Sequence, residues 1–256
     1  MKKYIALIIP IRGLIVSGES SAVSPIPFLP VAGGGVTYSE EISKFLKKVE
    51  TSRKVRAIIF EIDSPGGTPY ASKEIADSIK KLKIISVAQI KEYGTSGAYW
   101  IASSCSKIVA DPLSSIGGVG TRAERFDFSE LARKIGIKVD TFSTGEYKGM
   151  GSPYSETSEK EKTFIGEQVS VFNQYFVQQI KENRKITDEK VLENITSGKP
   201  YLGREALMMG LIDYLGNGEL ALKVASELAG VHLRVEYSKF SRERESILSK
   251  LFKKML

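Results

Sequence analysis

The chain has 256 residues, of which 42% are hydrophobic, so it can bury a substantial core as one large domain or two small ones. Basic residues exceed acidic ones by 37 − 30 = 7, but the surplus is spread along the chain without a nucleic-acid-binding motif, and we expect no nucleic-acid partner. Cys105 and His232 are the single cysteine and the single histidine, which excludes an internal disulfide and argues against a zinc site. Catalytic chemistry therefore has to come from oxygen, lysine or backbone groups.

The N-terminal stretch begins like a signal peptide, but Pro10 and Arg12 interrupt its apolar run. We interpret it as a buried strand. No stretch reaches 18 consecutive apolar residues, so the sequence predicts a cytoplasmic or peripheral membrane protein rather than an integral one. The Ser-, Pro- and Gly-rich segment 24–35 is expected to be irregular, either as the rim of a peptide groove or as a plain connection.

Strand and helix patterns alternate through the first half of the chain, which predicts βαβ units with a largely parallel sheet. Residues 39–49 have the spacing of an amphipathic helix, with Ser39 as its N-cap. The strand that follows is predicted to end at a DSPGG turn, residues 63–67. The predicted strands are 55–62, 84–90 and 107–111, and the predicted helices after the first are 71–83 and 96–105.

The second half of the chain is more helical and contains no internal repeat. We predict a short helix at 128–136, a strand at 138–144, a long helix at 158–184 with an apolar face, and helical pieces at 204–216 and 218–230. The predicted organisation is one domain, 1–235, followed by a basic amphipathic segment, 236–256. We expect that segment to pack against its own subunit or a second one, or alternatively to bind a membrane surface.

Ser96 is the candidate nucleophile, because it stands at a predicted strand-to-helix turn. A serine there has backbone N–H donors beside it, and Gly97 allows a substrate carbonyl to approach closely. The DSPGG turn offers a second donor from Gly67 or Gly66. Turns at the carboxyl ends of adjacent parallel strands face one crevice, so the two segments are expected to meet.

The base that accepts the Ser96 proton is harder to identify. His232 lies in an alternating strand near the C-terminus and is interpreted as a surface or half-buried histidine. A lysine can replace histidine where burial or neighbouring positive charge lowers its pKa. Lys148 is the candidate, because it follows a predicted strand and lies in a glycine-rich turn that could bury an amine.

Four segments, in order, resemble the signatures of the signal peptide peptidase A family, the S49 group of Ser-Lys peptidases. The resemblance implies an α/β fold of the ClpP/crotonase type, with repeated ββα units, a mostly parallel sheet and a helical C-terminal part. It also implies endoproteolysis of signal-peptide remnants or other extended, mostly apolar peptides, without a metal or organic cofactor. The segments are 58–80, 93–120, 143–162 and 195–222.

Carried onto this chain, the family nucleophile falls on Ser96, the base on Lys148, and the oxyanion donors on Gly67 and Gly97. The resemblance further implies a ring-shaped homo-oligomer in which adjacent protomers supply the serine and the lysine of each dyad. We expect peptides and further copies of the chain as partners, with a peripheral membrane contact as an additional expectation.

Two features depart from the family pattern. Family members usually carry an N-terminal membrane anchor, and none is visible in this sequence. Gly118 stands where the family tends to have a serine that helps to orient the lysine, so Ser115 or a water molecule takes that role, or the dyad is weaker. The alternative functions are a crotonase-like acyl-CoA enzyme and a catalytically weak peptide-binding scaffold.

Overall fold

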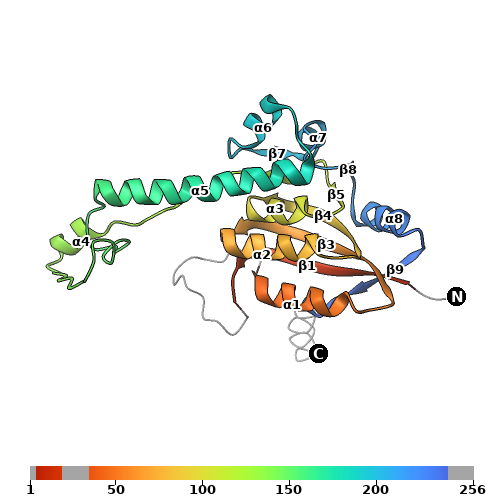
Figure 1. Cartoon of the computed structure of the whole chain (residues 1–256), viewed down its shortest axis with the longest axis horizontal. Helices are drawn as coiled ribbons and strands as arrows, with labels where there is room; N and C mark the ends of the chain where they lie inside the picture. The colour runs from red at the N-terminus through yellow and green to blue at the C-terminus, as the bar shows by residue number, and fades with distance from the viewer. Residues whose placement is uncertain (1–3, 19–34, 242–256) are drawn as a thin grey trace, which may run out of the picture. The chain divides into compact units, whose positions relative to one another are not determined.

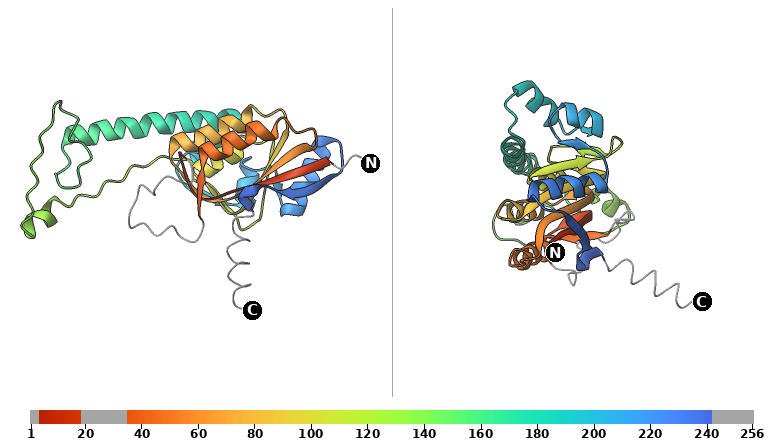
Figure 2. Two further views of the ribbon diagram at one scale, coloured as in Figure 1. Left: turned by 90° about the horizontal axis from the view of Figure 1, so that it is seen from below. Right: turned by 90° about the vertical axis from the view of Figure 1, so that its right-hand side faces the viewer.

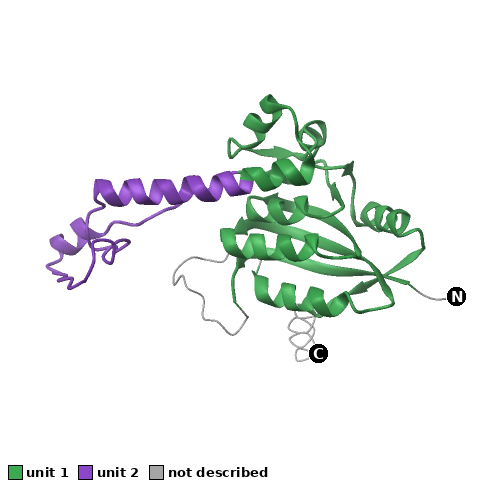
Figure 3. Ribbon diagram, in the orientation of Figure 1, with its two compact units in different colours: residues 1–119, 177–256 green, residues 120–176 purple. Residues whose placement is uncertain are grey.

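The computed structural model describes residues 4–18 and 35–241. Nearly all of the Ser-, Pro- and Gly-rich segment 24–35, and the apolar residues of the C-terminal segment beyond 241, lie outside the described residues. The chain divides into two compact units, which Figure 3 distinguishes by colour: unit 1 contains residues 1–119 and 177–256, and unit 2 contains residues 120–176.

The described strands all belong to one sheet in unit 1. The longest of them are rich in isoleucine, valine and alanine and are buried on both faces, as expected for parallel strands covered by helices. The strands are β1 (Tyr4–Val16), β2 (Val36–Tyr38), β3 (Val55–Gly67), β4 (Ile85–Thr95), β5 (Lys107–Ala110), β6 (Ser115–Gly117), β7 (Pro200–Leu202), β8 (Tyr214–Leu215) and β9 (Leu233–Tyr237).

The sheet has the order β2-β1-β3-β4-β5-β8 (Figure 1). Outside this path, β9 pairs with β1, while β6 pairs with β4 and β7. Every described pairing is parallel except β6 with β7, which is antiparallel. The largely parallel α/β sheet predicted from the sequence is confirmed.

Helices connect the strands, as parallel neighbours require. The predicted N-cap at Ser39 is wrong: Tyr38 holds the cap position, and the Ser39 hydroxyl lies in the first turn and donates to Glu74 at 2.5 Å. The helices are α1 (Ser39–Val49), α2 (Pro69–Lys80), α3 (Gly97–Ser103), α4 (Ser129–Lys134), α5 (Glu159–Arg184), α6 (Glu189–Ile195), α7 (Gly203–Met208) and α8 (Gly218–Ala229).

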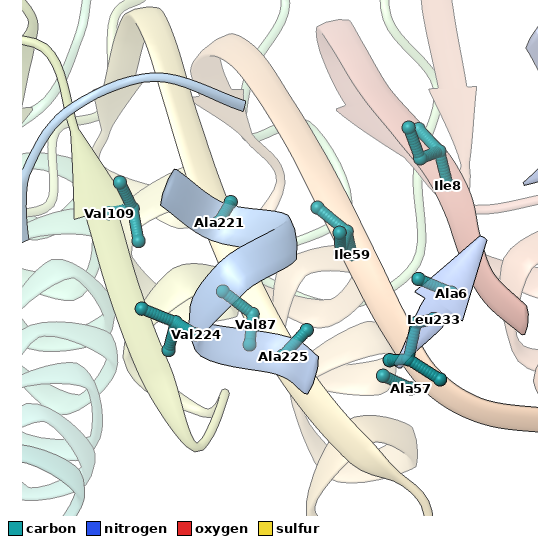
Figure 4. Close-up of a cluster of buried hydrophobic side chains, with 10 residues drawn as sticks. All are labelled: Ala6, Ile8, Ala57, Ile59, Val87, Val109, Ala221, Val224, Ala225 and Leu233. Atoms are coloured by element: carbon teal, nitrogen blue, oxygen red, sulfur yellow. The ribbon is translucent and has the colours of Figure 1, made fainter. Parts of the chain in front are cut away.

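Unit 1 is a three-layer arrangement with its core on both faces of the sheet. Figure 2 shows α1 and α2 on one side of the strands and α8 on the other. On the α8 side, Val224 and Ala225 pack against small and β-branched side chains of the strands, among them Ile59 and Val87 (Figure 4). These side chains are almost fully buried, so this interface anchors the strands that carry the candidate site.

Two predicted elements are wrong. Residues 138–144 do not form a strand, and Val139 is 49% and Phe142 is 96% exposed. No strand of the described chain lies beside them to bind their backbone N–H and C=O groups, which a strand requires. The helix predicted for 204–216 stops at Met208, where α7 ends. Gly210 then takes a left-handed conformation, φ +73°, and β8 pairs with β5.

Candidate active site

The ends of β3 and β4 bring the two predicted turns together. Both strands run further than their apolar patterns indicate, since Ser64 pairs with Gly94 and β6 pairs with the end of β4. The DSPGG residues are therefore the last residues of β3 rather than a separate turn. Residues 66–67 and 96–97 consequently lie side by side at the same edge of the sheet.

Ser96 occupies a strained position between β4 and α3. Its φ of 52° and ψ of −128° are unfavourable for a side chain, and of the described non-glycine residues only Ser96 and Lys185 have a positive φ. The Ser96 N–H donates to the Gly117 carbonyl at 2.7 Å, and the Ser96 carbonyl accepts the Trp100 N–H at 3.1 Å. A strained serine at a strand-to-helix turn is the geometry that presents a nucleophilic hydroxyl.

Glycines are required around Ser96 because backbone approaches backbone there. A Cβ on Gly66, whose φ is +109°, would lie 2.9 Å from the Gly97 nitrogen and 2.9 Å from the Ser96 Cβ. A Cβ on Gly97 would lie 2.1 Å from the Ser72 Oγ and 3.3 Å from the Gly67 nitrogen. The meeting of these two segments, expected from the sequence, is thus present in the structure.

Ser64 holds the end of β3 in place from the buried side. Its hydroxyl donates to the Gly13 carbonyl at 2.6 Å and accepts the Gly66 N–H at 3.0 Å. The Gly66 N–H therefore already has a partner within the fold. A Cβ on Gly67 would lie 1.9 Å from the Ile15 carbonyl oxygen, so only glycine fits against β1.

The residues that follow Gly97 form the core behind the site. Tyr99, Trp100 and Ile101 are buried, and the Tyr99 hydroxyl donates to the Leu211 carbonyl at 2.8 Å. Burial raises the pKa of Tyr99. Cys105 is also buried, and burial raises the pKa of its thiol, so it is an inert packing residue rather than a nucleophile.

Gly118 lies beside Ser96. A Cβ at position 118 would be 3.7 Å from the Ser96 nitrogen and 3.5 Å from the Thr95 Cβ, which are ordinary contacts. A serine would therefore fit next to the candidate nucleophile, although φ at this position is +57°. Ser115 is half-buried in β6, two residues before the carbonyl that binds the Ser96 N–H.

Lys148 belongs to unit 2, whereas Ser96 belongs to unit 1. Its N–H donates to the Gly145 carbonyl at 3.3 Å within a series of turns, and its side chain is exposed. The glycine-rich turn predicted from the sequence is present, but the turn itself does not bury the amine. His232 is exposed next to β9, as expected for a surface histidine.

Neither a metal site nor a membrane-spanning helix is found in the described chain. Between residues 35 and 241, and in 4–18, no cluster of three His, Cys, Asp or Glu side chains is placed to hold a metal ion. Within the same ranges, every helix is too short or too polar to cross a bilayer.

The sequence matches the family model "Peptidase family S49" over residues 78–232, which is more than half of the chain. The chain belongs to peptidase family S49. The matched residues include Ser96, Lys148 and the segments on both sides of them. The family resemblance noted in the sequence is therefore confirmed.

Three relatives illustrate how far the likeness to other S49 proteins extends. MJ0651 of Methanocaldococcus jannaschii is 32% identical over 188 residues, covering 73% of this chain and 60% of that protein. The chloroplastic serine protease SPPA of Arabidopsis thaliana is 29% identical over 224 residues, covering 84% of this chain and 33% of that protein. Protease 4 of Haemophilus influenzae is 26% identical over 239 residues, covering 92% of this chain and 37% of that protein. The chain thus spans about a third to three fifths of these relatives.

Solved structures share the S49 and ClpP-like fold. A variant of a membrane-bound stomatin-specific protease, in complex with a substrate peptide, has a TM-score of 0.58 at 18% identity, covering 98% of this chain and 100% of that one. A ClpP1 variant from Listeria monocytogenes has a TM-score of 0.50 at 16% identity, covering 72% and 86%. The α/β, ClpP-like fold class predicted from the sequence is confirmed.

Proposed function

We propose that this protein is a serine endopeptidase in which Ser96 is the nucleophile and Lys148 is the general base. The observation that carries the proposal is the strained backbone of Ser96, packed against Gly66 and Gly97 at the ends of two parallel strands. Such a turn exposes a hydroxyl while keeping backbone donors close to the reacting carbonyl. Membership of family S49 supports the same reaction class.

In the acylation step the Ser96 oxygen forms a bond to the substrate carbonyl carbon while the neutral Lys148 amine takes the hydroxyl proton. The scissile C–N bond then breaks, and the leaving amine receives that proton from Lys148. In the second step a water molecule attacks the acyl-enzyme and gives a proton to Lys148. The Ser96 oxygen leaves and recovers that proton, which regenerates the enzyme.

The oxyanion donors we propose are the N–H groups of Gly67 and Gly97. Gly66 was the other candidate on the DSPGG segment, but its N–H donates to the Ser64 hydroxyl. Gly67 is the next residue, and its nitrogen lies close to Gly97. Gly67 is the last residue of β3 and Gly97 is the first residue of α3, so both donors are held by regular structure and can stabilise the negative charge of the tetrahedral intermediate without reorganising.

The substrates we propose are extended, mostly apolar peptides such as signal-peptide remnants. Parallel strands end at the site, so a peptide can add its backbone alongside the DSPGG segment and place its carbonyl near Ser96. The stomatin-specific protease variant of the same fold is in complex with a substrate peptide, which supports peptides as the substrate class. Backbone pairing supplies affinity, and apolar pockets supply specificity.

We further propose that a second copy of the chain completes each dyad, in a ring-shaped homo-oligomer. Shielding from water is one way in which a lysine becomes a base, and Lys148 is exposed in the single chain. Unit 2 also exposes many large apolar side chains, which is typical of a surface that binds a partner. They include Phe126, Leu131, Ile135, Phe142, Val171 and Phe172.

The alternative of a catalytically weak peptide-binding scaffold is kept because Gly118 replaces a lysine-orienting serine. The test is to incubate wild-type protein, Ser96→Ala and Lys148→Ala with a mixed peptide library and to read the cut sites by mass spectrometry. We expect cleavage by wild-type protein and none by either variant, with circular dichroism unchanged. Peptide binding without cleavage by wild-type protein would support the scaffold, and cleavage by Ser96→Ala would exclude the proposed nucleophile.

A further inference from the structure

The segment that carries Lys148 has no regular secondary structure of its own. Residues 144–151 form successive turns in unit 2, in which the Met150 N–H donates to the Tyr147 carbonyl at 3.3 Å. Turns of this kind are mobile unless other groups hold them. A base has to be placed to within a fraction of an ångström, so something outside the turn has to fix it.

One anchor lies just before Lys148 and is exposed. The Tyr147 ring packs against the Phe164 ring of α5 with 5.5 Å between centroids, and the Lys160 amine lies 5.3 Å from the Tyr147 ring centroid. Lys160 also pairs with Glu146, which raises the pKa of Lys160. Because these charges are exposed, the ion pair contributes little to the stability of the turn.

The second anchor lies just after Lys148 and is buried. Glu161, in the first turn of α5, has a side chain only 7% exposed, and it accepts the Gly151 N–H at 2.7 Å. Arg125, whose side chain is 14% exposed, faces the same carboxylate, with 3.5 Å between its Nε and the Glu161 Oε1. The ion pair thus sits beneath the loop that follows Lys148.

The Arg125 guanidinium also binds this loop directly. It donates to the Ser155 carbonyl at 2.6 Å, and it makes further hydrogen bonds to the Ser152 carbonyl and the Thr157 hydroxyl. One planar group therefore holds three points of the loop, while Glu161 holds a fourth at Gly151. The Phe128 N–H adds a bond to the Pro153 carbonyl at 2.6 Å.

We propose that Arg125 and Glu161 are positioning residues for Lys148, which they hold through the loop 149–157. The proposal rests on the proposed function of Lys148 as the base. Gly151 follows Lys148 by three residues, so release of its N–H frees the turn that sets the direction of the lysine side chain. Removing Arg125 leaves the buried Glu161 carboxylate without its cation and frees three points of the loop. Removing Glu161 frees the Gly151 N–H and leaves Arg125 with Asp127, at 3.8 Å, as its ion-pair partner.

The test measures kcat and KM for a cleaved peptide with Arg125→Met, Arg125→Lys, Glu161→Ala and Glu161→Gln, in the full-length protein. We expect Arg125→Met and Glu161→Ala to lower kcat by roughly 10- to 100-fold with KM changed less than about 2-fold, because only the base is misplaced. Arg125→Lys keeps a charge, and Glu161→Gln keeps an acceptor for the Gly151 N–H. Both are therefore expected to recover part of the rate.

Hydrogen exchange supplies a second measurement at the loop itself. The Gly151 amide is expected to exchange faster in Glu161→Ala than in wild-type protein, and at an intermediate rate in Glu161→Gln. Glu159→Gln is the matched control, since Glu159 lies in the same turn of α5 but forms an exposed pair with Lys162. It is expected to leave kcat and Gly151 exchange unchanged.

The outcomes separate this proposal from the proposed function. If Ser96→Ala and Lys148→Ala abolish cleavage but folded Arg125→Met and Glu161→Ala keep the wild-type kcat, the positioning role is wrong and the dyad stands. If Lys148→Ala keeps its activity, the dyad itself is wrong. The thermal transition of each variant gives the fraction of its molecules that are unfolded in the assay. If that fraction accounts for the whole loss of kcat, the positioning role is also wrong.

Discussion

The backbone of Gly66 lies directly against that of Gly97: a Cβ on Gly66 would come within 2.9 Å of the Gly97 nitrogen. The contact joins the last residues of β3 to the residue after Ser96, although the two glycines are far apart in sequence. The turn that carries the proposed nucleophile and one of the proposed oxyanion donors is therefore placed by close contact with a glycine, where any side chain would clash.

Gly66→Ala is expected to lower kcat/KM by about 100-fold or more, because the added methyl group displaces both Ser96 and Gly97, and a misplaced oxyanion donor has that cost. Peptide cleavage and thermal unfolding of the purified variant test this. Gly166→Ala is the control, since nothing lies within 4 Å of its Cβ position on α5. It should keep full activity and gain about 0.5–1 kcal/mol of stability. Equal activity of both variants would contradict the packing argument.

Mixing inactive Ser96→Ala with inactive Lys148→Ala is expected to restore part of the activity, because some interfaces then pair an intact serine with an intact lysine. The measurement is peptide cleavage across mixing ratios after subunit exchange, with the mixed oligomer confirmed by native mass spectrometry. The control is each variant alone at the same total concentration. A confirmed mixed oligomer without activity at any ratio would leave each chain to supply its own dyad.

The cleavage rate is expected to rise with pH along a single limb, because the amine of Lys148 accepts a proton only in its neutral form. The pH dependence of kcat/KM for one peptide, measured over the range in which the protein stays folded, tests this. An acidic optimum would instead indicate a carboxylate in the rate-limiting proton transfer. Addition of a metal chelator is expected to leave the rate unchanged.

Asp213→Asn is expected to destabilise the fold by about 3 kcal/mol at neutral pH, because it removes one partner of a largely buried ion pair. Asp213 lies 3.0 Å from Arg184 and 3.0 Å from Lys107, and it accepts the Ile108 N–H at 2.8 Å. Burial by itself would raise the pKa of Asp213, but Arg184 and these hydrogen bonds lower it below its usual value. Urea unfolding of both proteins at pH 7 measures the loss.

The pH dependence of that stability follows from the direction of the shift. A lowered pKa means that the unfolded chain binds more protons in acid, so stability rises with pH. The contribution of Asp213 is complete above its unfolded pKa of about 4 and is lost as the pH falls through the lower folded value. Asp213→Asn should flatten the stability curve in this acid range. Parallel curves for the two proteins would show that the ion pair is not the cause.

The α/β class, the parallel strands and the kinds of residue at the candidate site could all be predicted from the sequence alone. The spacing of apolar residues predicts buried strands and helices because each element has to bury one face. This requirement shows in residues that are close together in the sequence. Ser96, Gly97 and the DSPGG glycines were equally visible, because a strained turn and a close backbone approach restrict the residue type at each position. The glycine-rich turn indicated Lys148 among the many lysines, and the family resemblance then placed the base at the same residue.

Elements whose stability depends on a distant partner were predicted wrongly or missed. The apolar pattern at 138–144 suits a strand, but a strand also needs a neighbour to bond, and the described chain supplies none. The helix predicted at 204–216 is interrupted because β8 finds a partner in β5. Pairing of this kind is decided between segments, so a local pattern cannot show it. The helix α6 was also missed, although Asp188 caps its first turn, which is a local signal.

The contacts that hold the site residues in place become visible only in the folded chain. Nothing in the sequence distinguishes Ser64 and Ser72 from other serines. In the structure, Ser64 accepts the Gly66 N–H, and Ser72 fills the space that a side chain at position 97 would need. Arg125 and Glu161 are 36 residues apart, and nothing in the sequence indicates that they meet, but the fold buries them together beneath the loop after Lys148. A buried ion pair forms where two distant segments pack, and that packing depends on the whole chain rather than on the residues next to either charge.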